Sequence, residues 1–471
     1  MMDSEVARKK RRHRNERIAA SVLVILAIAA TLAIREWNLE SKRQLERDQT
    51  YIPKKPVVTP EVLLLQEYVR IDTSTADGAA KGAHWIARYL EKNGIHAEVI
   101  ESAPGRLNVY ARIEGKNRGG GLLLFNHIDV VPAGAGWTHS PFGGEMAGNT
   151  LNGRGTLDMK GIAVCQLVAF VGVAKSERKP SHDLVFLATA DEETGSTYGM
   201  QWLLENRRDI FEGVEGAITE GGITELIREQ MTYFGIEVTG KQRVAVTIGS
   251  PDRRALQNLR IALEPYMTAR RAPRILPAVR EYFHETAPTR IAFRPYLSDV
   301  DWAIREGHFW RLPVPYRELT QNTIWCSGVF EREGEWQMYL NLRNLPDADP
   351  DERLAWLERT AGAHGARIVR VTTKEGPSPT ASRDTKVYGI LVKEAKRRYR
   401  TSVGPILGYR TASDSRFLRP RGIHAYGVSP YPVDLAGSAT IHGTNERIRL
   451  DSLAEGVDFM KNVVMDWAEA E

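Results

Sequence analysis

Short apolar runs that end in glycine, histidine or acidic residues recur through the first half of the chain. Such runs predict strands at 96–101, 107–113 and 122–127. Apolar residues at helical spacing predict helices at 61–70 and 83–93. Strand and helix patterns alternate through Val238, which is typical of an α/β domain. We therefore expect a mostly parallel central sheet that is buried on both faces.

The pattern changes near Lys241 and changes back near residue 373. Strand and helix patterns in this interval fall at 243–248, 252–266, 336–343, 349–360 and 366–371. Residues 267–320 are rich in Arg and Pro and show weak periodicity. The α/β pattern resumes with 386–400, 424–428 and 450–469. At 471 residues the chain is long enough for two domains. We expect a small α+β unit, 241–372, inserted into a domain made of 61–240 and 373–471.

The N-terminal segment has the pattern of a membrane anchor. Residues 1–17 are basic, 18–34 carry no charge, and 35–60 form a charged, Pro-rich linker. As a helix, 18–34 would be about 26 Å long, close to the bilayer core. Basic residues before the span predict a single pass through the cell inner membrane, with the remainder extracytoplasmic, or periplasmic in a bacterium. The alternatives are a signal peptide whose cleavage gives a secreted protein, and a buried core helix.

Charge and cysteine content give no support to two function classes. The net charge is +5, but residues 1–17 hold seven bases and three acids, so the folded part is nearly neutral. Nucleic-acid binding is therefore not supported. Cys165 and Cys326 lie far apart in different predicted domains, which favours two buried free thiols over a disulfide or a catalytic cysteine.

Four segments with histidine or acidic residues follow predicted strands. They contain His127, Asp158, Glu193 and Glu220. Because ligands of open α/β sheets bind at the carboxyl ends of the strands, we expect these side chains to meet at one edge. Taken alone, each segment can also be explained without a metal, as a structural histidine or as a solvated acidic turn. Adjacent carboxylates beside a buried strand repel one another, however, which makes a cation among them more favourable.

Together with His442, these side chains form a set of two imidazoles and three carboxylates. This N/O donor set is typical of zinc, cobalt or manganese rather than of a thiolate structural site. Five ligands exceed the needs of one catalytic zinc with an open position. They suit two ions about 3.5–4 Å apart that share a carboxylate.

The order of these motifs resembles the dinuclear zinc aminoacylase/carboxypeptidase family. The motifs are His127-x-Asp129, Gly153-Arg-Gly-Thr-x-Asp158-Met-Lys-Gly161, Asp191-Glu-Glu-Thr-Gly195, Glu220-Gly-Gly222 and His442-Gly-x-Asn-Glu446. The run Thr411-Ala-Ser-Asp414-Ser-Arg416 is also similar. The family includes glutamate carboxypeptidase, acetylornithine deacetylase, succinyl-diaminopimelate desuccinylase and carboxypeptidase S. The resemblance covers roughly residues 57–471.

The resemblance implies a zinc-aminopeptidase-like catalytic domain and a role for each motif residue. Asp158 would bridge two Zn²⁺ ions, with Co²⁺ or Mn²⁺ as alternatives. His127 and Glu220 would complete one ion site, and Glu193 and His442 the other. Asp129 would orient His127, and Glu192 would be the general base. A cis peptide is implied at Asp158-Met159.

The inserted unit would be the family's ferredoxin-like lid, which often forms a homodimer. Arg343 matches the lid arginine that holds a substrate carboxylate, although an exposed strand charge explains it equally well. The lid histidine that stabilises the oxyanion in the family is missing, because Ile248-Gly-Ser-Pro-Asp252 stands at its place. Another group, such as an arginine of 267–311, could replace it; otherwise the substrate geometry differs or activity is low.

These features predict a membrane-anchored dizinc hydrolase. It would cut the amide bond of a C-terminal residue or of an N-acyl amino acid, so that its partners are small peptides or N-acyl amino acids. The alternative is a catalytically weak or inactive protein that binds metal and ligand on the same scaffold.

Overall fold

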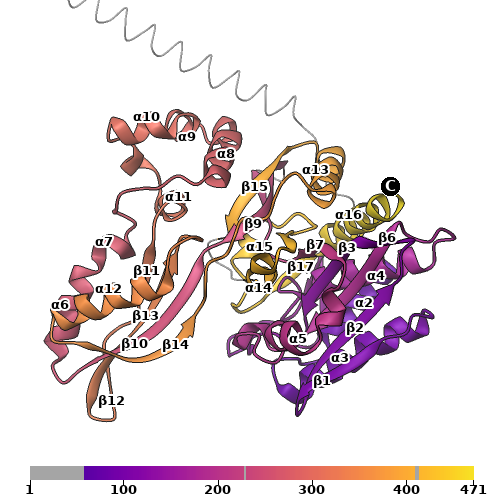
Figure 1. Cartoon of the computed structure of the whole chain (residues 1–471), viewed down its shortest axis with the longest axis horizontal. Coiled ribbons are helices and arrows are strands. Elements are labelled where there is room, and N and C mark those ends of the chain that lie inside the picture. Colours follow the sequence, from indigo (N-terminus) through magenta and orange to yellow (C-terminus); the bar gives the residue numbers. More distant parts are fainter. Residues whose placement is uncertain (1–57, 228–229, 409–412, 471) are drawn as a thin grey trace, which may run out of the picture. The chain divides into compact units, whose positions relative to one another are not determined.

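A nine-stranded sheet carries the sequence motifs in the computed structural model, which describes residues 58–227, 230–408 and 413–470 (Figure 1). Its strand order is β1 (Glu98–Ala103), β2 (Arg106–Ile113), β6 (His182–Thr189), β3 (Asn117–His127), β7 (Val214–Thr219), β16 (His424–Gly427), β9 (Gln230–Gly240) and β15 (Ser402–Gly408). β8 (Ile223–Ile227) pairs with β9.

The sheet is mixed, whereas the sequence led us to expect mostly parallel strands. β6, β3, β7 and β16 are mutually parallel, as are β9 and β15. The pairs β1–β2, β2–β6, β8–β9 and β9–β16 are antiparallel. The short connections from β1 to β2 and from β8 to β9 explain part of the difference, because hairpins join antiparallel strands. Every motif strand lies in the parallel part.

Alternate residues of the central strands pack into two separate cores. Leu122 and Leu124 of β3 face one core, and Leu123 and Phe125 face the other. This follows from the two-residue period of a strand. The first core holds residues of α2 (Pro60–Val69), α3 (Ala76–Lys92), α4 (Lys160–Ala174), α13 (Lys386–Tyr399) and α16 (Leu450–Glu469). The second holds residues of α5 (Met200–Asn206) and α14 (Ser415–Leu418).

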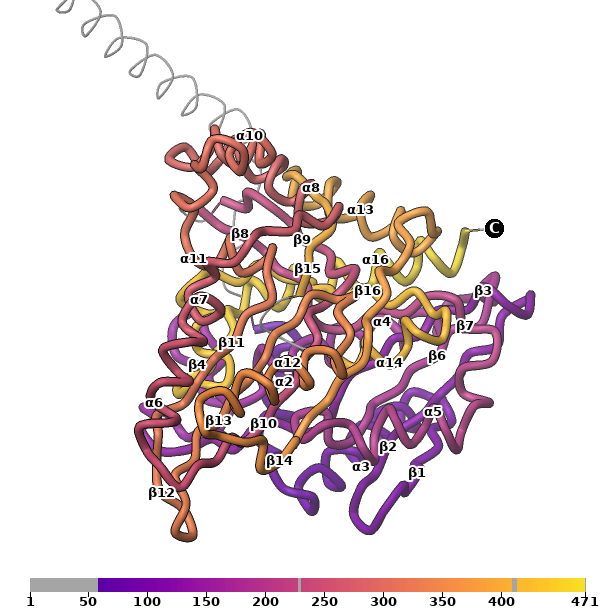
Figure 2. Tube along the Cα trace, turned by 60° about the vertical axis from the view of Figure 1, so that its left-hand side comes forward, coloured from indigo at the N-terminus to yellow at the C-terminus, as the bar shows by residue number. Residues whose placement is uncertain are grey.

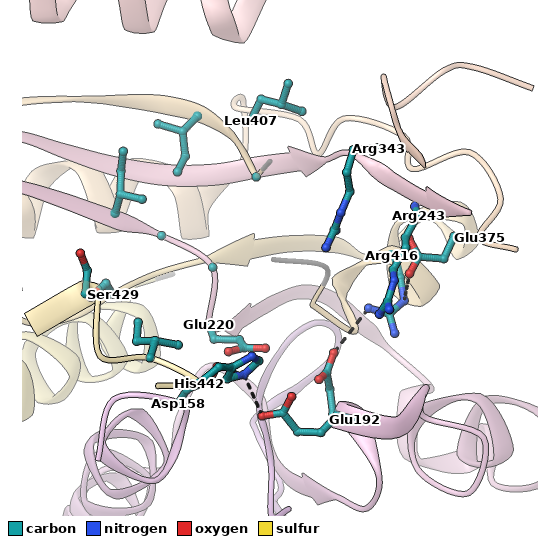
Figure 3. A pocket seen from close by; sticks show the side chains of 18 of the residues that line it. Asp158, Glu192, Glu220, Arg243, Arg343, Glu375, Leu407, Arg416, Ser429 and His442 are labelled. Atoms are coloured by element: carbon teal, nitrogen blue, oxygen red, sulfur yellow. Dashed lines mark hydrogen bonds and ion pairs between the residues drawn. The ribbon is translucent and has the colours of Figure 1, made fainter. Parts of the chain in front are cut away.

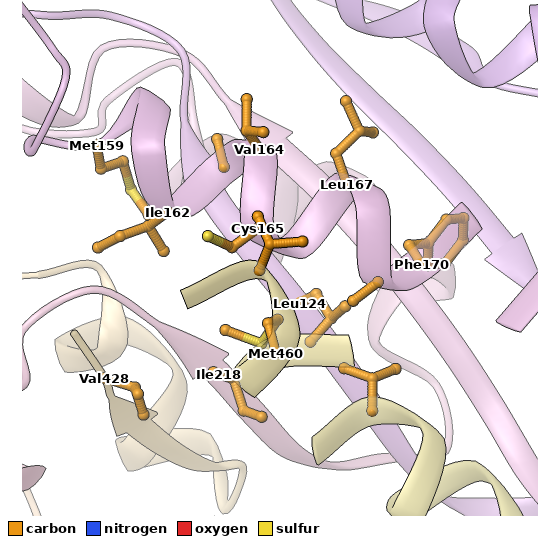
Figure 4. Packing of buried hydrophobic residues seen from close by; sticks show 14 of the residues in the cluster. Leu124, Met159, Ile162, Val164, Cys165, Leu167, Phe170, Ile218, Val428 and Met460 are labelled. Carbon is orange, nitrogen blue, oxygen red and sulfur yellow. The ribbon is translucent and has the colours of Figure 1, made fainter. Parts of the chain in front are cut away.

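Helix α4 is the most enclosed helix of the first core. Between Gly161 and Ala174 it carries no charged residue, and nearly all of its side chains are buried. In Figure 4, Cys165 and Phe170 of α4 lie among Leu124, Ile218 and Met460. The two cysteines, Cys165 and Cys326, are buried and free, as expected.

The inserted unit has a second, antiparallel sheet. Its order is β11 (Thr323–Cys326), β13 (Glu335–Asn344), β10 (Gln242–Ser250) and β14 (Arg367–Lys374), with β12 (Phe330–Arg332) paired to β13. The helices α6 (Arg253–Ala262), α7 (Glu264–Met267) and α12 (Pro350–Gly362) contribute to the same apolar cluster. Apart from α7, β12 and the helices of residues 268–322, the elements follow the β-α-β-β-α-β order of ferredoxin-like units.

Residues 268–322 interrupt this unit with short helices. They are α8 (Pro277–Thr286), α9 (Arg294–Ser298), α10 (Val300–Arg305) and α11 (Val314–Glu318). Val279 and Phe283 of α8 belong to an apolar cluster with Ile406 and Leu407 of β15. Figures 1 and 2 both show α8 beside β9 and β15. The insertion therefore packs against an edge of the large sheet.

A small three-stranded sheet and several short turns complete the described chain. The sheet has the order β17 (Arg447–Arg449), β5 (Thr150–Asn152) and β4 (Glu145–Ala147). The predicted anchor, 18–34, lies outside the described residues. Within the described part of the chain, no helix combines the length and apolar character needed to span a membrane.

Candidate metal centre

The five predicted ligands come from five separate segments that end at one side of the large sheet. His127 is the last residue of β3, and Glu220 directly follows β7. Asp158 lies before α4, and Glu193 belongs to the 3₁₀ turn Glu192–Thr194 after β6. His442 lies between α15 (Leu435–Ser438) and β17. The structure brings all five together, and Figure 3 shows Asp158, Glu192, Glu220 and His442 around one cleft.

The five side chains form two groups of potential metal ligands that share Asp158. One group is His127, Asp158 and Glu220, and the other is Asp158, Glu193 and His442. Within each group the ligand atoms lie within 4.8 Å of one another.

The two carboxylate oxygens of Asp158 serve different groups. Oδ1 lies 3.2 Å from Nε2 of His127, and Oδ2 lies 2.9 Å from Nε2 of His442. The remaining ligands lie beside the same imidazoles: Glu220 Oε1 is 3.7 Å from His127 Nε2, and Glu193 Oε1 is 3.2 Å from His442 Nε2. This arrangement and the N/O donor set fit two divalent cations with Asp158 between them.

Burial and mutual repulsion set the protonation of the acids around the cleft. Burial, together with the charge of Asp158, raises the pKa of Glu220 to about 7. Burial, followed by the charge of Asp414, raises the pKa of Glu192 well above its usual value. Hydrogen bonds to Asp158 and Glu193 raise the pKa of His442 to about 10. Burial opposes ionisation of Asp158, but hydrogen bonds to His127 and His442 lower its pKa. A divalent cation would favour the deprotonated form of all these carboxyls.

Asp129 lies between His127 and the acidic turn. Nδ1 of His127 is 2.8 Å from the main-chain carbonyl of Asp129 and 3.8 Å from its Oδ1. The Asp129 carboxylate instead accepts hydrogen bonds from the amides of Glu192 (3.0 Å) and Glu193 (3.1 Å). The carbonyl contact can fix the imidazole with Nε2 toward the metal site. The carboxylate positions the turn that bears Glu192 and Glu193.

Glu446 positions the loop that carries Asp158, a role that the sequence analysis missed. Its buried carboxylate accepts hydrogen bonds from the amides of Gly155 (3.0 Å), Leu157 (2.8 Å) and Asp158 (3.2 Å). It also pairs with Arg154 at 2.5 Å. The only indication of this role in the sequence was that Glu446 ends the His442 motif. The Asp158–Met159 peptide is cis, as the resemblance implied.

We expect Glu446→Gln to weaken metal binding about 10- to 100-fold, because supports of metal ligands typically contribute that much. Glutamine keeps the shape of the side chain but replaces one acceptor oxygen with an NH₂ donor. This NH₂ group would face the N–H groups of the loop, which are also donors. Competition with a fluorescent chelator measures the effect. Exposed Glu67→Gln serves as the control. Wild-type metal affinity in Glu446→Gln would contradict the assigned role.

The metal centre opens into a cleft of about 1570 Å³ that also reaches the inserted unit. Arg243 of β10 and Arg343 of β13 lie opposite each other in register and both line the cleft. Figure 3 shows them with Arg416 and Glu375 on one side of the metal centre. Nη1 of Arg343 is buried and has no hydrogen-bond partner within the described residues. An anionic ligand group would satisfy it.

Among the described residues, Arg416 is the arginine that forms an ion pair with Glu192. Its Nη1 lies 3.4 Å from Glu192 Oε1, and its Nε lies 3.7 Å from Glu375 Oε1. Within the described residues of the inserted unit, neither a histidine nor any arginine of 267–311 lines the cleft. His308 instead packs against Trp302, with ring centroids 5.0 Å apart. The arginines of 267–311 therefore lie outside this chain's own cleft, and whether one of them replaces the missing lid histidine stays a prediction.

Comparison with known proteins agrees with the motifs. The model of Peptidase family M20/M25/M40 matches residues 123–466, which is more than half of the chain. The chain belongs to this family. The resemblance inferred from the motif order is thus confirmed.

Curated M20 relatives match only part of the chain. Over 157 residues it is 37% identical to a succinyl-diaminopimelate desuccinylase of Methylobacterium sp. (strain 4-46), covering 32% of this chain and 39% of that protein. Over 125 residues it is 38% identical to an acetylornithine deacetylase of Aliivibrio salmonicida (strain LFI1238). This match covers 26% of this chain and 32% of that protein. The matched part therefore spans about a third to two fifths of these relatives' length.

Solved structures support the fold over most of the chain. An M20 family metallo-carboxypeptidase, Sso-CP2 from Sulfolobus solfataricus, gives a TM-score of 0.68 at 19% identity, covering 88% of this chain and all of that chain. Human carnosine dipeptidase 1 gives a TM-score of 0.64 at 15% identity, and the match covers 87% of this chain and 97% of that chain. The α/β M20 fold with a mixed sheet is thus shared with these proteins.

Proposed function

We propose that this M20 protein is a dinuclear metallohydrolase that cuts the amide bond of a C-terminal residue or of an N-acyl amino acid. The observation that carries the proposal is the placement of Asp158, whose two carboxylate oxygens lie beside two different histidines. The names of the matched relatives, a desuccinylase and a deacetylase, agree with cleavage of an acyl amide.

The donor set supports two divalent cations as the cofactor, with zinc as the first choice and cobalt or manganese as alternatives. When bound, such a pair supplies a Lewis acid and activates water. The residues for this role are His127, Asp158, Glu193, Glu220 and His442.

Glu192 is the residue suited to move protons. It lines the cleft but belongs to neither group of potential metal ligands. Its carboxylate would accept a proton from water and donate it to the leaving nitrogen, as a general base and then acid. Arg416, 3.4 Å from Glu192 Oε1, would hold this carboxylate in place.

Arg343 is suited to bind the substrate carboxylate. Its side chain lines the same cleft, and its unpartnered Nη1 can donate to an anion. A planar guanidinium binds a carboxylate with two hydrogen bonds. Burial and the neighbouring Arg243 lower the pKa of Arg343, so a bound carboxylate would relieve repulsion between the two guanidinium groups.

We also propose that residues 18–34 anchor the protein in the inner membrane with the hydrolase domain outside the cytoplasm, and that the inserted unit forms a homodimer. The uncharged run behind a basic segment supports the anchor. Signal cleavage and secretion is the alternative. The family resemblance alone supports the dimer.

The second candidate function is ligand binding without turnover. The lid sequence favours it, because Ile248-Gly-Ser-Pro-Asp252 stands where the family carries its oxyanion-stabilising histidine. Loss of an oxyanion donor typically lowers turnover about 10²- to 10³-fold.

Metal analysis combined with hydrolysis assays separates the two functions. The full chain is purified in detergent, loaded with Zn²⁺, Co²⁺ or Mn²⁺, and assayed on N-acyl amino acids and dipeptides. We expect about two ions per chain and amide hydrolysis that chelation abolishes. Two bound ions without hydrolysis of any substrate would favour the binding protein.

A further inference from the structure

The sheet of the inserted unit presents a polar wall to the cleft. Among the described residues of its strands that line the cleft, every side chain is polar. These residues are Arg243 of β10, Asn341 and Arg343 of β13, and Thr372, Thr373 and Lys374 of β14. Arginine and lysine supply all the charges of this wall, so electrostatic complementarity favours an anionic ligand group against it.

Two of these cations have no ionic partner. Lys374 pairs with Asp351 at 2.9 Å. Arg243 and Arg343, by contrast, lie directly opposite each other in the pairing of β10 with β13, where like charges repel. No carboxylate of the described residues forms an ion pair with either guanidinium group. Nε of Arg243 and Nη1 of Arg343 are both buried without a hydrogen-bond partner among the described residues, so each arginine needs an acceptor of its own.

The charged groups beside this wall are occupied elsewhere. Oε2 of Glu375 accepts a hydrogen bond from the main-chain amide of Arg243 at 2.6 Å, and Oε1 of Glu375 lies 3.7 Å from Nε of Arg416. Nη1 of Arg416 in turn lies 3.4 Å from Glu192 Oε1. The guanidinium groups of Arg243 and Arg343 are therefore the ones left for a ligand (Figure 3).

We infer that Arg243 is a second anion-binding residue, so that the preferred substrates are those that release an acidic amino acid, aspartate or glutamate. The inference rests on the proposed hydrolase function. The α-carboxylate of the released residue binds Arg343, and its side-chain carboxylate binds Arg243.

The register of the two strands decides which carboxylates can be bound. Residues directly opposite in an antiparallel pair have Cα atoms about 4.5–5.5 Å apart, which suits two carboxylates joined by a short carbon chain. Aspartate and glutamate carry such a pair. A carboxylate on the acyl side is separated from the α-carboxylate by the scissile amide, which must lie at the metal centre. It therefore does not suit two neighbouring arginines.

Substrate pairs that differ in this one charge test the inference with the full-length, metal-loaded protein. Glutamate and glutamine are compared as N-acetyl amino acids and as the second residue of alanyl dipeptides, with leucine as the apolar reference. We expect kcat/KM to be at least about tenfold higher for glutamate than for glutamine, because hydrogen bonds to a charged group are the stronger ones. Equal or lower kcat/KM for glutamate would overturn the inference but leave the hydrolase function intact. Failure to hydrolyse any member with two ions bound would instead overturn the function itself.

Variants of single arginines test where the second carboxylate binds. Arg243→Gln should lower the glutamate-to-glutamine ratio of kcat/KM about tenfold, toward one. Arg343→Gln should lower kcat/KM for both substrates, because both carry the α-carboxylate. Arg243→Lys should keep part of the preference, because lysine still supplies the charge but not the planar fork. Arg370→Gln is the matched control and should keep the wild-type ratio, since Arg370 of β14 is exposed and lies outside the cleft lining.

The ratio within each variant separates a lost contact from a general defect. An unchanged ratio in Arg243→Gln would overturn the role of Arg243. An equal fall for glutamate and glutamine at a wild-type Tm would also overturn it, because both arginines would then hold the single α-carboxylate. The wild-type ratio and Arg243→Lys decide the question if Arg243→Gln does not fold.

Discussion

Replacing Glu192 with glutamine is expected to lower kcat about 10³-fold while both metal ions stay bound. General acid–base groups typically contribute 10²- to 10⁴-fold to turnover. Glu192 lies outside both groups of potential metal ligands, so its loss removes proton transfer rather than metal. Its side chain is only 10% exposed, and burial followed by the charge of Asp414 raises its pKa. A carboxylate whose affinity for protons is raised is well suited to take one from water.

Steady-state kinetics and elemental analysis of the same preparation measure this effect. Glutamine preserves the volume of the side chain and can still contact Arg416, so we expect little change in KM or thermal stability. Glu67→Gln, an exposed carboxylate on α2, is the matched control and should behave as the wild type. Retention of more than about a tenth of wild-type kcat in Glu192→Gln would exclude Glu192 as the general base.

The central strands and the metal centre were predictable because their signals are local. The run Leu122–His127 is apolar and ends in a polar residue, and the same holds for the runs before Asp191 and Glu220. The carboxyl ends of parallel strands lie at one edge of the sheet. The clustering of His127, Glu193 and Glu220 could therefore be predicted from their places after apolar strands. His442 carries no such signal, and only the motif order pointed to it.

Other parts of the structure depend on contacts between distant segments. The helices of 268–322 are short and contain prolines, and they are stabilised by packing against β15 rather than by a long amphipathic pattern. Arg243 faces the cleft because it lies opposite Arg343 in a strand pair whose register the sequence does not show. Arg416 was visible in a motif, but its contact with Glu192 was not.

Single substitutions at the metal centre should remove the two ions separately or together. His442 belongs only to the group with Glu193, and Glu220 only to the group with His127. We therefore expect His442→Ala and Glu220→Ala each to retain about one ion per chain. Asp158 belongs to both groups, so Asp158→Ala should bind close to none. All three variants should lose most of their activity, because water activation by a metal pair needs both ions.

Elemental analysis after dialysis, together with thermal melts, distinguishes these outcomes. Metal at 100 times its Kd stabilises the folded state by about 2.7 kcal/mol per site, so a variant that binds no ion should also lose the metal-dependent increase in Tm. His442 is 49% exposed, so its removal should cost little packing, and His96→Ala, at a side chain 90% exposed and outside both groups, is the control. Two ions bound to Asp158→Ala would show that this carboxylate does not link the two sites. One ion in the wild type, lost equally in His442→Ala and Glu220→Ala, would replace the dinuclear centre with a single site.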